Sequence, residues 1–575
     1  MTYTERYNKW LNSPKIDDET RAELAAIKDD DNEIKERFIK DLEFGTGGLR
    51  GIIGAGDNRM NIYTVKKATQ GLCEDIKNKG EEYMKRGVVI AYDSRHKSDE
   101  FAKESALTLA ANGIKAYLFE SLRPTPVLSF AVRYKKAAAG IVVTASHNPK
   151  EYNGYKAYGE DGGQLPPESS DYVISIIDKL DIFDDVLTTD YDKAVSEGLI
   201  EIIGEEVDNA YLAAVKEQSV NEEAARSLGD NFKLVYTPFH GAGNIPVRRI
   251  LDMTGVKNVY VVKEQEMPDG DFPTLKSPNP EENEGFKLAI ELAKKVDADV
   301  IIATDPDSDR VGVTIKDKSG NYITLTGNQT GILLCEFILR NRKLKGTLPK
   351  NGAVIKTIVT TDMIYPIADD YKTTVFDVLT GFKFIGEMIK EFEQTGSYEY
   401  LFGFEESYGY LAGTYARDKD AVVASMLIAQ MAADYKTKGK TLYEGLMSLY
   451  EKYGYHKDLL HNVVLKGLDG AEKIKSIMKE IRENPPKEID GHKVTKVLDV
   501  LKGTETDVLT GAVTKSNLPS SNVLKFFLDD KSWFAARPSG TEPKIKFYFG
   551  VTADSEENAD KKITALRDAV IAMIE

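Results

Sequence analysis

Short apolar runs and amphipathic helical patterns alternate along most of the chain. Residues 88–93 (Val-Val-Ile-Ala-Tyr-Asp) form an apolar run that ends in polar residues, helical periodicity follows from Asp99 to Asn112, and a second strand pattern covers residues 114–119. Because parallel strands need a crossover, which is usually a helix, this alternation predicts βαβ units and a largely parallel sheet. The same succession of patterns recurs later, with apolar runs at residues 232–238, 300–305 and 352–357.

The two ends of the chain depart from this alternation. Residues 1–43 have the pattern of polar helices, and a glycine-dense loop follows at residues 44–51. After the Pro-Pro pair at residues 485–486 the sequence is rich in strand patterns, and a final helix is predicted over about residues 555–574. We therefore predict an α/β protein with three consecutive α/β domains, each with a mixed sheet, followed by a C-terminal α+β domain, around a central cleft. The predicted domain bounds are residues 1–215, 216–325, 326–460 and 461–575.

Composition narrows the class of protein. A chain of 575 residues is too long for one hydrophobic core, and a net charge of -16 disfavours nucleic acid as a partner. Two distant cysteines, Cys73 and Cys335, offer neither a disulfide framework nor a zinc ribbon. Neither an apolar leader nor a run of about 18 apolar residues occurs in the sequence. We expect a cytoplasmic protein, a monomer or homodimer, that binds neither nucleic acid nor a membrane.

A serine stands at the end of the apolar run at residues 141–149 (Ile-Val-Val-Thr-Ala-Ser-His-Asn-Pro). The Asn148-Pro149 pair prevents the strand from continuing, so Ser146 is expected at its C-terminal end. That edge of a parallel α/β sheet is where ligands bind. On residue type alone, the alternative is that Ser146 or Asn148 caps a turn.

Three aspartates follow the apolar run at residues 300–304. In an extended stretch, Asp305, Asp307 and Asp309 would face the same side. Clustered carboxylates repel one another, so we expect a hard divalent cation between them, Mg²⁺ first. A calcium loop of the Asp-x-Asp-x-Asp-Gly type is excluded because Arg310 and Lys316 occupy the positions that require glycine and glutamate. The alternative is that the three aspartates form an ordinary solvent-exposed turn.

Residues 537–544 (Arg-Pro-Ser-Gly-Thr-Glu-Pro-Lys) predict a tight turn near the C-terminus. Arg537 offers a guanidinium, Ser539 and Thr541 offer hydroxyls, and Gly540 and Thr541 offer backbone N–H groups. Such a nest suits a phosphate dianion, and Arg537 and Lys544 on either side favour phosphate over a plain hairpin turn.

A fourth loop, at residues 403–409 (Gly-Phe-Glu-Glu-Ser-Tyr-Gly), carries adjacent acids and a serine. Glu405 and Ser407 can accept and donate hydrogen bonds to vicinal sugar hydroxyls. Residues 380–383 (Thr-Gly-Phe-Lys) precede this loop. The alternative is a surface pair of acids, which the flanking glycines at residues 403 and 409 disfavour.

Together, in this order and spacing, the four motifs resemble those of the α-D-phosphohexomutase superfamily, and the loop through Arg50 matches as well. Within this superfamily, the chain resembles the long bacterial phosphoglucomutases in its extended N-terminus and in the Tyr408-Gly409 pair that follows Ser407. The resemblance covers nearly the whole chain. It implies an isomerase that carries a phosphoryl group on Ser146 and interconverts glucose 1-phosphate and glucose 6-phosphate through enzyme-bound glucose 1,6-bisphosphate.

The resemblance also implies a role for each candidate residue. One Mg²⁺ per chain would be held by phosphorylated Ser146 and the three aspartates, and Arg310 would stabilise charge on the phosphoryl oxygens. His147 and Lys156 are candidates for proton transfer, and Arg50 and Lys383 are candidates for substrate contacts. The sugar hydroxyls would be held by Glu405 and Ser407, and the phosphate that is not transferred would be held by Arg537, Ser539, Gly540 and Thr541.

Three other functions stay open on the sequence alone. A phosphomannomutase or phosphopentomutase would use the same mechanism on another sugar. A metal-dependent phosphatase would share the aspartate site but would have no use for a second phosphate nest. A non-catalytic sugar-phosphate sensor would keep the fold without turnover.

Overall fold

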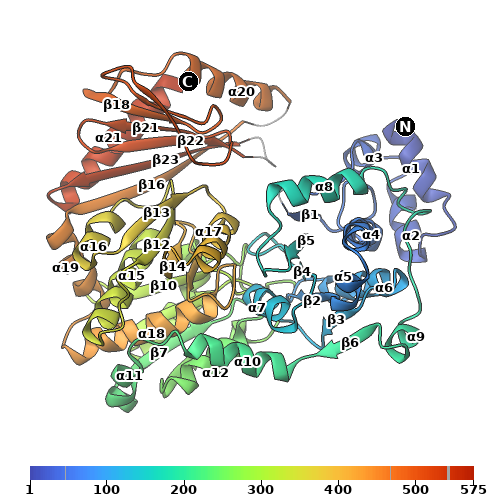
Figure 1. The fold of residues 1–575 in the computed structure, drawn as a ribbon, viewed down its shortest axis with the longest axis horizontal. Helices are drawn as coiled ribbons and strands as arrows, with labels where there is room; N and C mark the ends of the chain where they lie inside the picture. Colours follow the sequence, from blue (N-terminus) through green and yellow to red (C-terminus); the bar gives the residue numbers. More distant parts are fainter. Residues whose placement is uncertain (46, 466–467, 540–543, 575) are drawn as a thin grey trace. The chain divides into compact units, whose positions relative to one another are not determined.

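The computed structural model describes residues 1–45, 47–465, 468–539 and 544–574. Contacts divide the chain into two compact units. The first unit comprises Met1–Gly327, Ile385–Gly403 and Ser407–Leu442; the second comprises Asn328–Phe384, Phe404–Glu406 and Tyr443–Glu575. Figure 1 shows the elements of both units. Within the described residues, no helix combines the length and the hydrophobicity of a membrane span.

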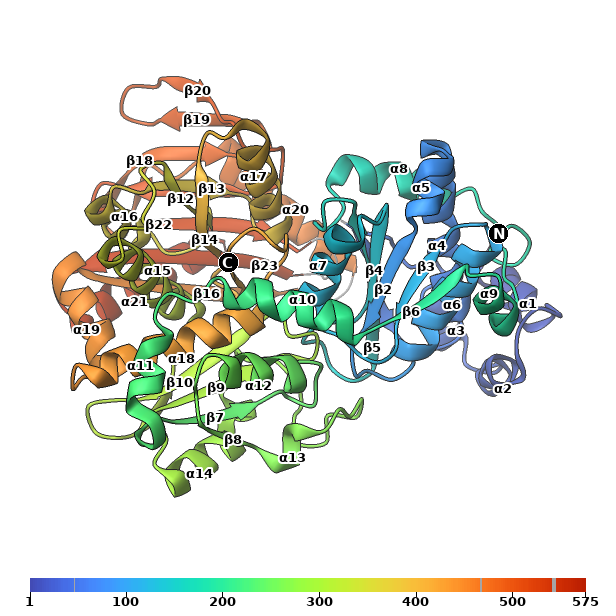
Figure 2. The ribbon, with the colours of Figure 1, turned by 60° about the horizontal axis from the view of Figure 1, so that its bottom comes forward.

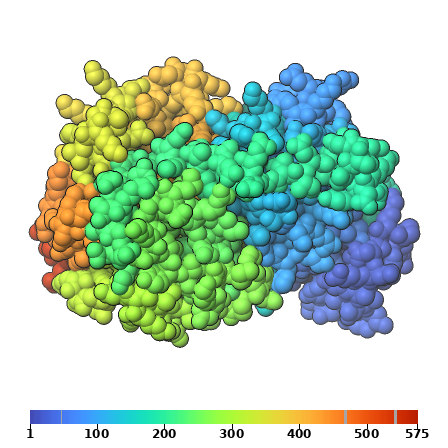
Figure 3. Space-filling view, turned by 90° about the horizontal axis from the view of Figure 1, so that it is seen from below, coloured from blue at the N-terminus to red at the C-terminus, as the bar shows by residue number. Residues whose placement is uncertain are grey.

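The first unit opens with three short helices, α1 (Tyr3–Leu11), α2 (Asp18–Ala26) and α3 (Asp31–Phe38). Each has a side-chain N-cap, from Thr2, Asp17 and Asp30 respectively, which satisfies a backbone N–H at the helix start. Their apolar faces pack together around Trp10 and Phe38. Figure 3 shows them in dark blue against the rest of the same unit.

A six-stranded mixed sheet forms the core of the N-terminal part of the first unit. Its strand order is β1-β5-β4-β2-β3-β6, in which β4, β2, β3 and β6 are parallel and β5 is antiparallel to both β1 and β4. Parallel strands covered on both faces are apolar throughout, as β4 is. Helices α4 and α6 cover one face and α7 covers the other (Figure 2). The strands are β1 (Gly48–Ile52), β2 (Val88–Tyr92), β3 (Ala116–Phe119), β4 (Ala139–Val143), β5 (Tyr152–Gly159) and β6 (Ile200–Ile203), and the helices are α4 (Ile62–Lys79), α5 (Glu81–Arg86), α6 (Ser98–Ala111), α7 (Thr125–Lys135), α8 (Pro167–Ile177) and α9 (Tyr191–Ser196).

The second sheet of the first unit has five strands in the order β11-β10-β9-β7-β8. β7 is parallel to β8 and β9, and β10 is antiparallel to β9, so this sheet is also mixed. Helix α18 (Ala421–Thr437) is buried along most of its length and packs on β9 and α12. The other elements here are α10 (Glu205–Lys216), α11 (Glu222–Leu228), β7 (Lys233–Thr237), α12 (Asn244–Met253), β8 (Asn258–Val261), α13 (Lys263–Glu266), α14 (Lys287–Val296), β9 (Val300–Thr304), β10 (Val311–Lys316), β11 (Tyr322–Thr324), β14 (Glu399–Phe404, whose last residue falls in the second unit) and β15 (Tyr410–Ala412).

The second unit contains a parallel strand pair and a large antiparallel sheet. β12 (Gly352–Thr357) pairs in parallel with β13 (Thr374–Val378). The sheet follows the order β16-β23-β22-β21-β18-β19-β20, with β17 paired to β18, and α20 and α21 pack on it. The predicted fold class of α/β domains with mixed sheets and a C-terminal α+β domain is confirmed. The remaining elements are α15 (Gly327–Leu344), α16 (Ile364–Tyr371), α17 (Phe382–Thr395, which from Ile385 on belongs to the first unit), α19 (Leu442–Tyr453), β16 (Tyr455–Val464), α20 (Leu468–Glu483), β17 (Glu488–Ile489), β18 (His492–Asp499), β19 (Thr504–Asp507), β20 (Val513–Lys515), β21 (Leu524–Leu528), β22 (Trp533–Pro538), β23 (Lys544–Ala553) and α21 (Glu556–Ile574).

Candidate active site

Ser146 lies in the turn that follows strand β4. The strand ends at Val143, and the backbone of Ser146 adopts a left-handed conformation with φ 53°. Its buried hydroxyl donates a hydrogen bond to Asp305 Oδ2 at 2.9 Å and lies 3.2 Å from His147 Nδ1. A non-glycine residue seldom adopts this conformation, and here it directs the hydroxyl at the aspartate loop that follows β9.

The three predicted aspartates lie together, although not for the reason that the sequence suggested. Residues 305–309 form a tight turn with Ser308 at φ 51°, and not an extended stretch. The turn arises because Asp305 Oδ1 accepts hydrogen bonds from the backbone N–H groups of Asp309 at 3.1 Å and Arg310 at 3.0 Å. One carboxylate oxygen from each aspartate still falls within 4.8 Å of the others, and all three residues are buried.

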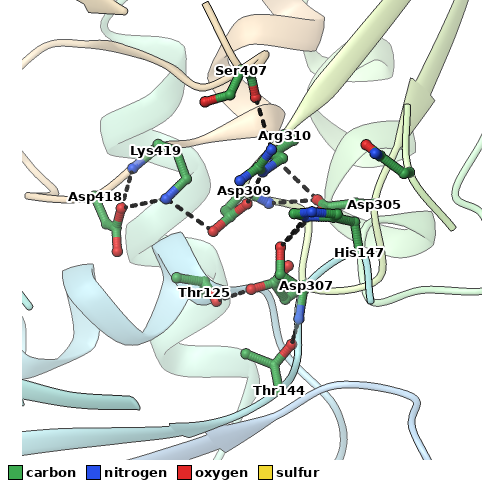
Figure 4. A network of polar contacts seen from close by, with 12 residues as sticks. Thr125, Thr144, His147, Asp305, Asp307, Asp309, Arg310, Ser407, Asp418 and Lys419 are labelled. Carbon is green, nitrogen blue, oxygen red and sulfur yellow. Dashed lines mark hydrogen bonds and ion pairs between the residues drawn. The ribbon is translucent and has the colours of Figure 1, made fainter. Parts of the chain in front are cut away.

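Two ammonium groups lie against the aspartates, and Figure 4 shows one of them, that of Lys419. Lys156 Nζ, from β5, is 2.9 Å from Asp307 Oδ2 and 3.6 Å from Asp309 Oδ2. Lys419 Nζ, from the loop before α18, is 3.1 Å from Asp309 Oδ2. Although burial opposes it, the attraction of Lys419 and Lys156 holds the pKa of Asp309 well below its usual range. Burial and the two neighbouring carboxylates instead raise the pKa of Asp305 well above its usual value.

The donor set fits a hard divalent cation. Among the described residues, Asp307 Oδ1 and Asp309 Oδ1 are buried and have no hydrogen-bond partner, and leaving such atoms unpaired is costly. Both belong to a cluster of three carboxylates, the oxygen ligands that Mg²⁺ prefers. A bound cation would satisfy these oxygens and relieve the repulsion that raises the pKa of Asp305.

Basic groups surround the serine and the aspartate turn. Arg310 Nη1 donates to Glu281 Oε1 at 3.0 Å and to the carbonyl oxygen of Ser407 at 3.1 Å. Arg50, on β1, donates to Asn148 Oδ1 at 3.2 Å. Burial and then Arg310 lower the pKa of His147 well below its usual value, so its imidazole is neutral at pH 7. A neutral imidazole next to Ser146 is able to accept a proton.

Models of one family match four successive segments of this chain. They are the α/β/α domains I, II and III of phosphoglucomutase/phosphomannomutase at residues 41–182, 209–320 and 326–453, and the C-terminal domain at residues 473–563. The chain belongs to the phosphoglucomutase/phosphomannomutase family. The predicted resemblance to the α-D-phosphohexomutase superfamily is therefore confirmed.

Curated relatives and solved structures agree with this membership. The chain is 38% identical to a phosphoglucomutase of Staphylococcus epidermidis over 92% of its own length and 94% of the relative's. It is 36% identical to a phosphoglucomutase of Staphylococcus aureus over 93% and 94%. A putative phosphomannomutase from Thermus thermophilus has the same fold, with a TM-score of 0.67 at 23% identity, covering 93% of this chain and 99% of that one.

In this phosphoglucomutase/phosphomannomutase family member, the loop at residues 403–409 is divided between the two units. Ser407 belongs to the first unit, where its carbonyl accepts from Arg310, and Glu405 belongs to the second. Glu405 Oε1 accepts a hydrogen bond from the backbone N–H of Gly381 at 2.9 Å. Gly381, which precedes α17 and its residue Lys383, therefore lies beside Glu405.

The phosphate-nest prediction falls partly outside the described residues. Arg537 lies near the end of strand β22, where it pairs with Lys546 on β23, and Lys544 is the first residue of β23. Ser539 donates its backbone N–H to the carbonyl of Lys544 at 2.8 Å, while Gly540 and Thr541 lie outside the described residues. Burial and then the negative charge of Glu406 raise the pKa of Tyr548, on β23, and the positive charge of Arg537 opposes that rise.

Sequence reasoning missed several residues that contact the site. Lys419 lies in the run Arg417-Asp418-Lys419-Asp420, which looks like an ordinary charged loop but enters α18 with Asp420 as the N-cap. Thr125, at the start of α7, donates its hydroxyl to Asp307 Oδ2 at 2.8 Å. Arg95 follows strand β2 and contacts the backbone of the Ser146 loop. The available signal for Arg95 was its place at the polar end of a predicted parallel strand, next to the strand that carries Ser146.

Proposed function

We propose that this protein is a phosphoglucomutase that interconverts glucose 1-phosphate and glucose 6-phosphate through a phosphoserine at Ser146. The observation that carries the proposal is Ser146 Oγ at 2.9 Å from Asp305 Oδ2, beside Asp307 and Asp309, each with a buried oxygen that has no hydrogen-bond partner among the described residues. The identity of 36–38% to curated phosphoglucomutases over more than nine-tenths of the chain supports the choice of glucose.

In the proposed reaction, the bond between phosphorus and Ser146 Oγ breaks as a new bond forms between phosphorus and a hydroxyl oxygen of the sugar phosphate. The sugar hydroxyl loses one proton and Ser146 Oγ gains one. The product is glucose 1,6-bisphosphate, which turns round and returns its other phosphoryl group to Ser146. His147, neutral and 3.2 Å from Ser146 Oγ, is positioned to accept the proton that the sugar hydroxyl loses. Lys156, which burial and the aspartates keep in a fixed place, is the second candidate for proton transfer.

Charge stabilisation is the main contribution that the site can offer to phosphoryl transfer. Mg²⁺, held by Asp305, Asp307, Asp309 and a phosphoserine oxygen, would supply Lewis-acid stabilisation of the transferring group. Arg310 would stabilise charge on the same group from its own guanidinium, and its contacts with Glu281 and Ser407 fix that guanidinium in place. Arg50 lies close enough to the Ser146 loop to contact the substrate.

The second phosphate and the sugar need their own contacts. We assign the sugar hydroxyls to Glu405 and Ser407, with Lys383 as a further contact, and the phosphate that is not transferred to Arg537, Ser539, Gly540 and Thr541. The same contacts must serve both orientations of the bisphosphate, because the phosphate is on C1 in one half-reaction and on C6 in the other. We further propose a cytoplasmic monomer or homodimer with sugar phosphates as its partners and with neither nucleic acid nor a membrane as a ligand.

Replacement of the serine tests the proposal directly. We expect purified wild-type protein to carry a phosphoryl mass increment that maps to Ser146, and Ser146→Ala to lose both the increment and glucose 1-phosphate isomerisation, by more than about 10⁴-fold. Exposed Ser175, on α8, provides the matched control Ser175→Ala, which should retain both. Full isomerase activity in Ser146→Ala would refute the mechanism.

The same assay distinguishes the rival functions. Inorganic phosphate as the main product would identify a phosphatase, and phosphorylated protein without turnover would identify a sensor. Comparison of kcat/KM for the 1-phosphates of glucose, mannose and ribose would identify the sugar. We expect glucose to be preferred, and chelation of divalent cations to abolish turnover until Mg²⁺ is restored.

A further inference from the structure

Arg95 forms a clamp on the backbone of the Ser146 loop. This buried residue follows β2, and its Nη2 donates to the carbonyl oxygens of Ser146 at 2.6 Å and Asn148 at 2.5 Å. Its Nη1 donates to the carbonyl oxygens of Pro149 at 2.9 Å and Tyr152 at 3.1 Å. One planar guanidinium therefore binds three carbonyl groups of the segment that connects β4 to β5 and the carbonyl of Tyr152, the first residue of β5.

The other end of the clamp reaches the amide of Ser146. Asp93 Oδ2 lies 3.3 Å from Arg95 Nε and accepts a hydrogen bond from Thr144 Oγ1 at 2.6 Å. Thr144 Oγ1 in turn accepts the backbone N–H of Ser146 at 2.8 Å. Asp93 is itself held by Ser98 Oγ at 2.8 Å and by the backbone N–H of Arg95 at 3.0 Å. The peptide groups on both sides of Ser146 are thus attached to one buried ion pair.

The conformation of Ser146 explains why such a clamp is needed. A side chain with a Cβ disfavours the left-handed region, so a serine stays there only when surrounding contacts hold it. A rotation of this backbone would turn Ser146 Oγ away from Asp305. No lysine could replace the clamp, because its donors all sit on one atom, whereas the guanidinium presents them in a rigid plane.

We propose that Arg95 is a positioning residue for phosphoryl transfer: through the carbonyl groups of the Ser146 loop, and with Asp93 and Thr144 at the amide side, it keeps Ser146 Oγ directed at the aspartate site. Arg95 donates to backbone carbonyls and does not touch the transferring group. This inference rests on the proposed function, because alignment matters only if Ser146 carries the phosphoryl group.

Arg95→Lys tests the clamp while keeping the positive charge. We expect kcat to fall by at least about 100-fold, the effect of a displacement of about 1 Å in a reacting group, while KM changes by less than about threefold. The melting temperature and circular dichroism identify the folded fraction, to which kcat is normalised. A purely structural role would lower the folded fraction and leave the normalised kcat unchanged, which would overturn the proposal.

A second pair of variants covers the case in which Arg95→Lys does not fold. Thr144→Val keeps the size of the side chain but loses the hydroxyl that joins Asp93 to the amide of Ser146, and Thr144→Ser keeps that hydroxyl. We expect kcat to fall at least tenfold in Thr144→Val and to be rescued in Thr144→Ser. Equal kcat in the two folded variants would overturn the proposal. A wild-type protein without Ser146 phosphorylation would instead refute the proposed function, and this inference with it.

Discussion

Lys419 illustrates how the charge of a single residue can serve catalysis and oppose metal binding at once. Its ammonium group lies 3.1 Å from Asp309 and 3.0 Å from Asp418, and it is mostly buried. Two unit charges at about 4 Å interact by about 4 kcal/mol at an effective dielectric constant of 20, so this ammonium affects every other charge in the site. In the proposed reaction it would attract the phosphoryl group and repel a cation that binds to Asp309.

Lys419→Met should therefore separate the two effects. We expect kcat to fall by about 10²–10³-fold, because a cation that stabilises developing charge is lost, while Mg²⁺ binds as tightly as before or more tightly. Isothermal titration with Mg²⁺ and steady-state kinetics measure the two quantities. Lys438→Met, which removes an ordinary ion pair with Asp434 on helix α18, is the matched control and should change neither. Weaker Mg²⁺ binding with normal kcat would contradict this role.

A site residue could be predicted from the sequence when the signal for it lay next to it in the chain, and not when its partners were distant in sequence. Ser146 and Asp305 were found because each follows an apolar strand pattern directly, so a local signal marks a functional place. Lys419 has no such signal, and the place of Arg95 after a predicted strand does not reveal its partner, because Asp309 and the carbonyl of Ser146 come close to these residues only through tertiary packing. A buried ion pair cannot be told from a surface charge in the sequence alone.

At the scale of elements, the loop after β7 shapes the aspartate turn. A Cβ on Gly241 would lie 2.4 Å from the Cα of Pro306, and the next residue, Ala242, donates its backbone N–H to the carbonyl of Pro306 at 2.8 Å. Glycine is thus required at residue 241 because the backbone there lies too close to the backbone of Pro306 for a side chain to fit. The backbone of Pro306, between Asp305 and Asp307, would have to move to accept a methyl group.

We therefore expect Gly241→Ala to weaken the binding of Mg²⁺ at the aspartate turn. Forcing a methyl group into this contact should cost about 1–3 kcal/mol of stability and raise the Mg²⁺ concentration for half-maximal activity at least about tenfold. Activity titrations with Mg²⁺ and thermal melts measure the two effects. In Gly163→Ala the added Cβ meets only ordinary contacts of 3.4 Å or more, so this control should keep the wild-type Mg²⁺ requirement. Unchanged Mg²⁺ dependence in a folded Gly241→Ala would refute the idea.

The succession of elements was more predictable than the conformations of the loops. The strands at residues 88–92, 300–304 and 352–357 follow their apolar runs closely, since burial on both faces demands such runs. The aspartate segment was wrongly expected to be extended, because the backbone N–H groups that close the turn on Asp305 leave no trace in the hydrophobic pattern. The turn signal after Arg537 came from Pro, Ser and Gly, but the sequence did not show that pairing with β23 extends β22 through Pro538.

At the scale of the whole molecule, the proposed roles divide between the two units. Ser146, the aspartates, Lys156 and Arg310 belong to the first unit, and Arg537, Ser539 and Glu405 belong to the second. The residues proposed for phosphoryl transfer thus lie far along the chain from those proposed to bind the second phosphate. This division suits an enzyme that must keep its phosphoserine chemistry constant while a bisphosphate reverses its orientation.

Arg537→Ala should therefore impair recognition and leave the transfer chemistry intact. We expect KM for glucose 1-phosphate to rise about 10–100-fold, because a charge-assisted contact with phosphate is lost, while saturating glucose 1,6-bisphosphate still phosphorylates Ser146 to the wild-type extent. Steady-state kinetics and intact mass spectrometry measure the two quantities. Arg567→Ala, on α21 of the same unit, removes a surface arginine paired with Asp568 and should behave as wild type. If Arg537→Ala lowers the extent of Ser146 phosphorylation by the same factor as it raises KM, Arg537 contributes to the transfer itself. The proposed division of roles would then be wrong.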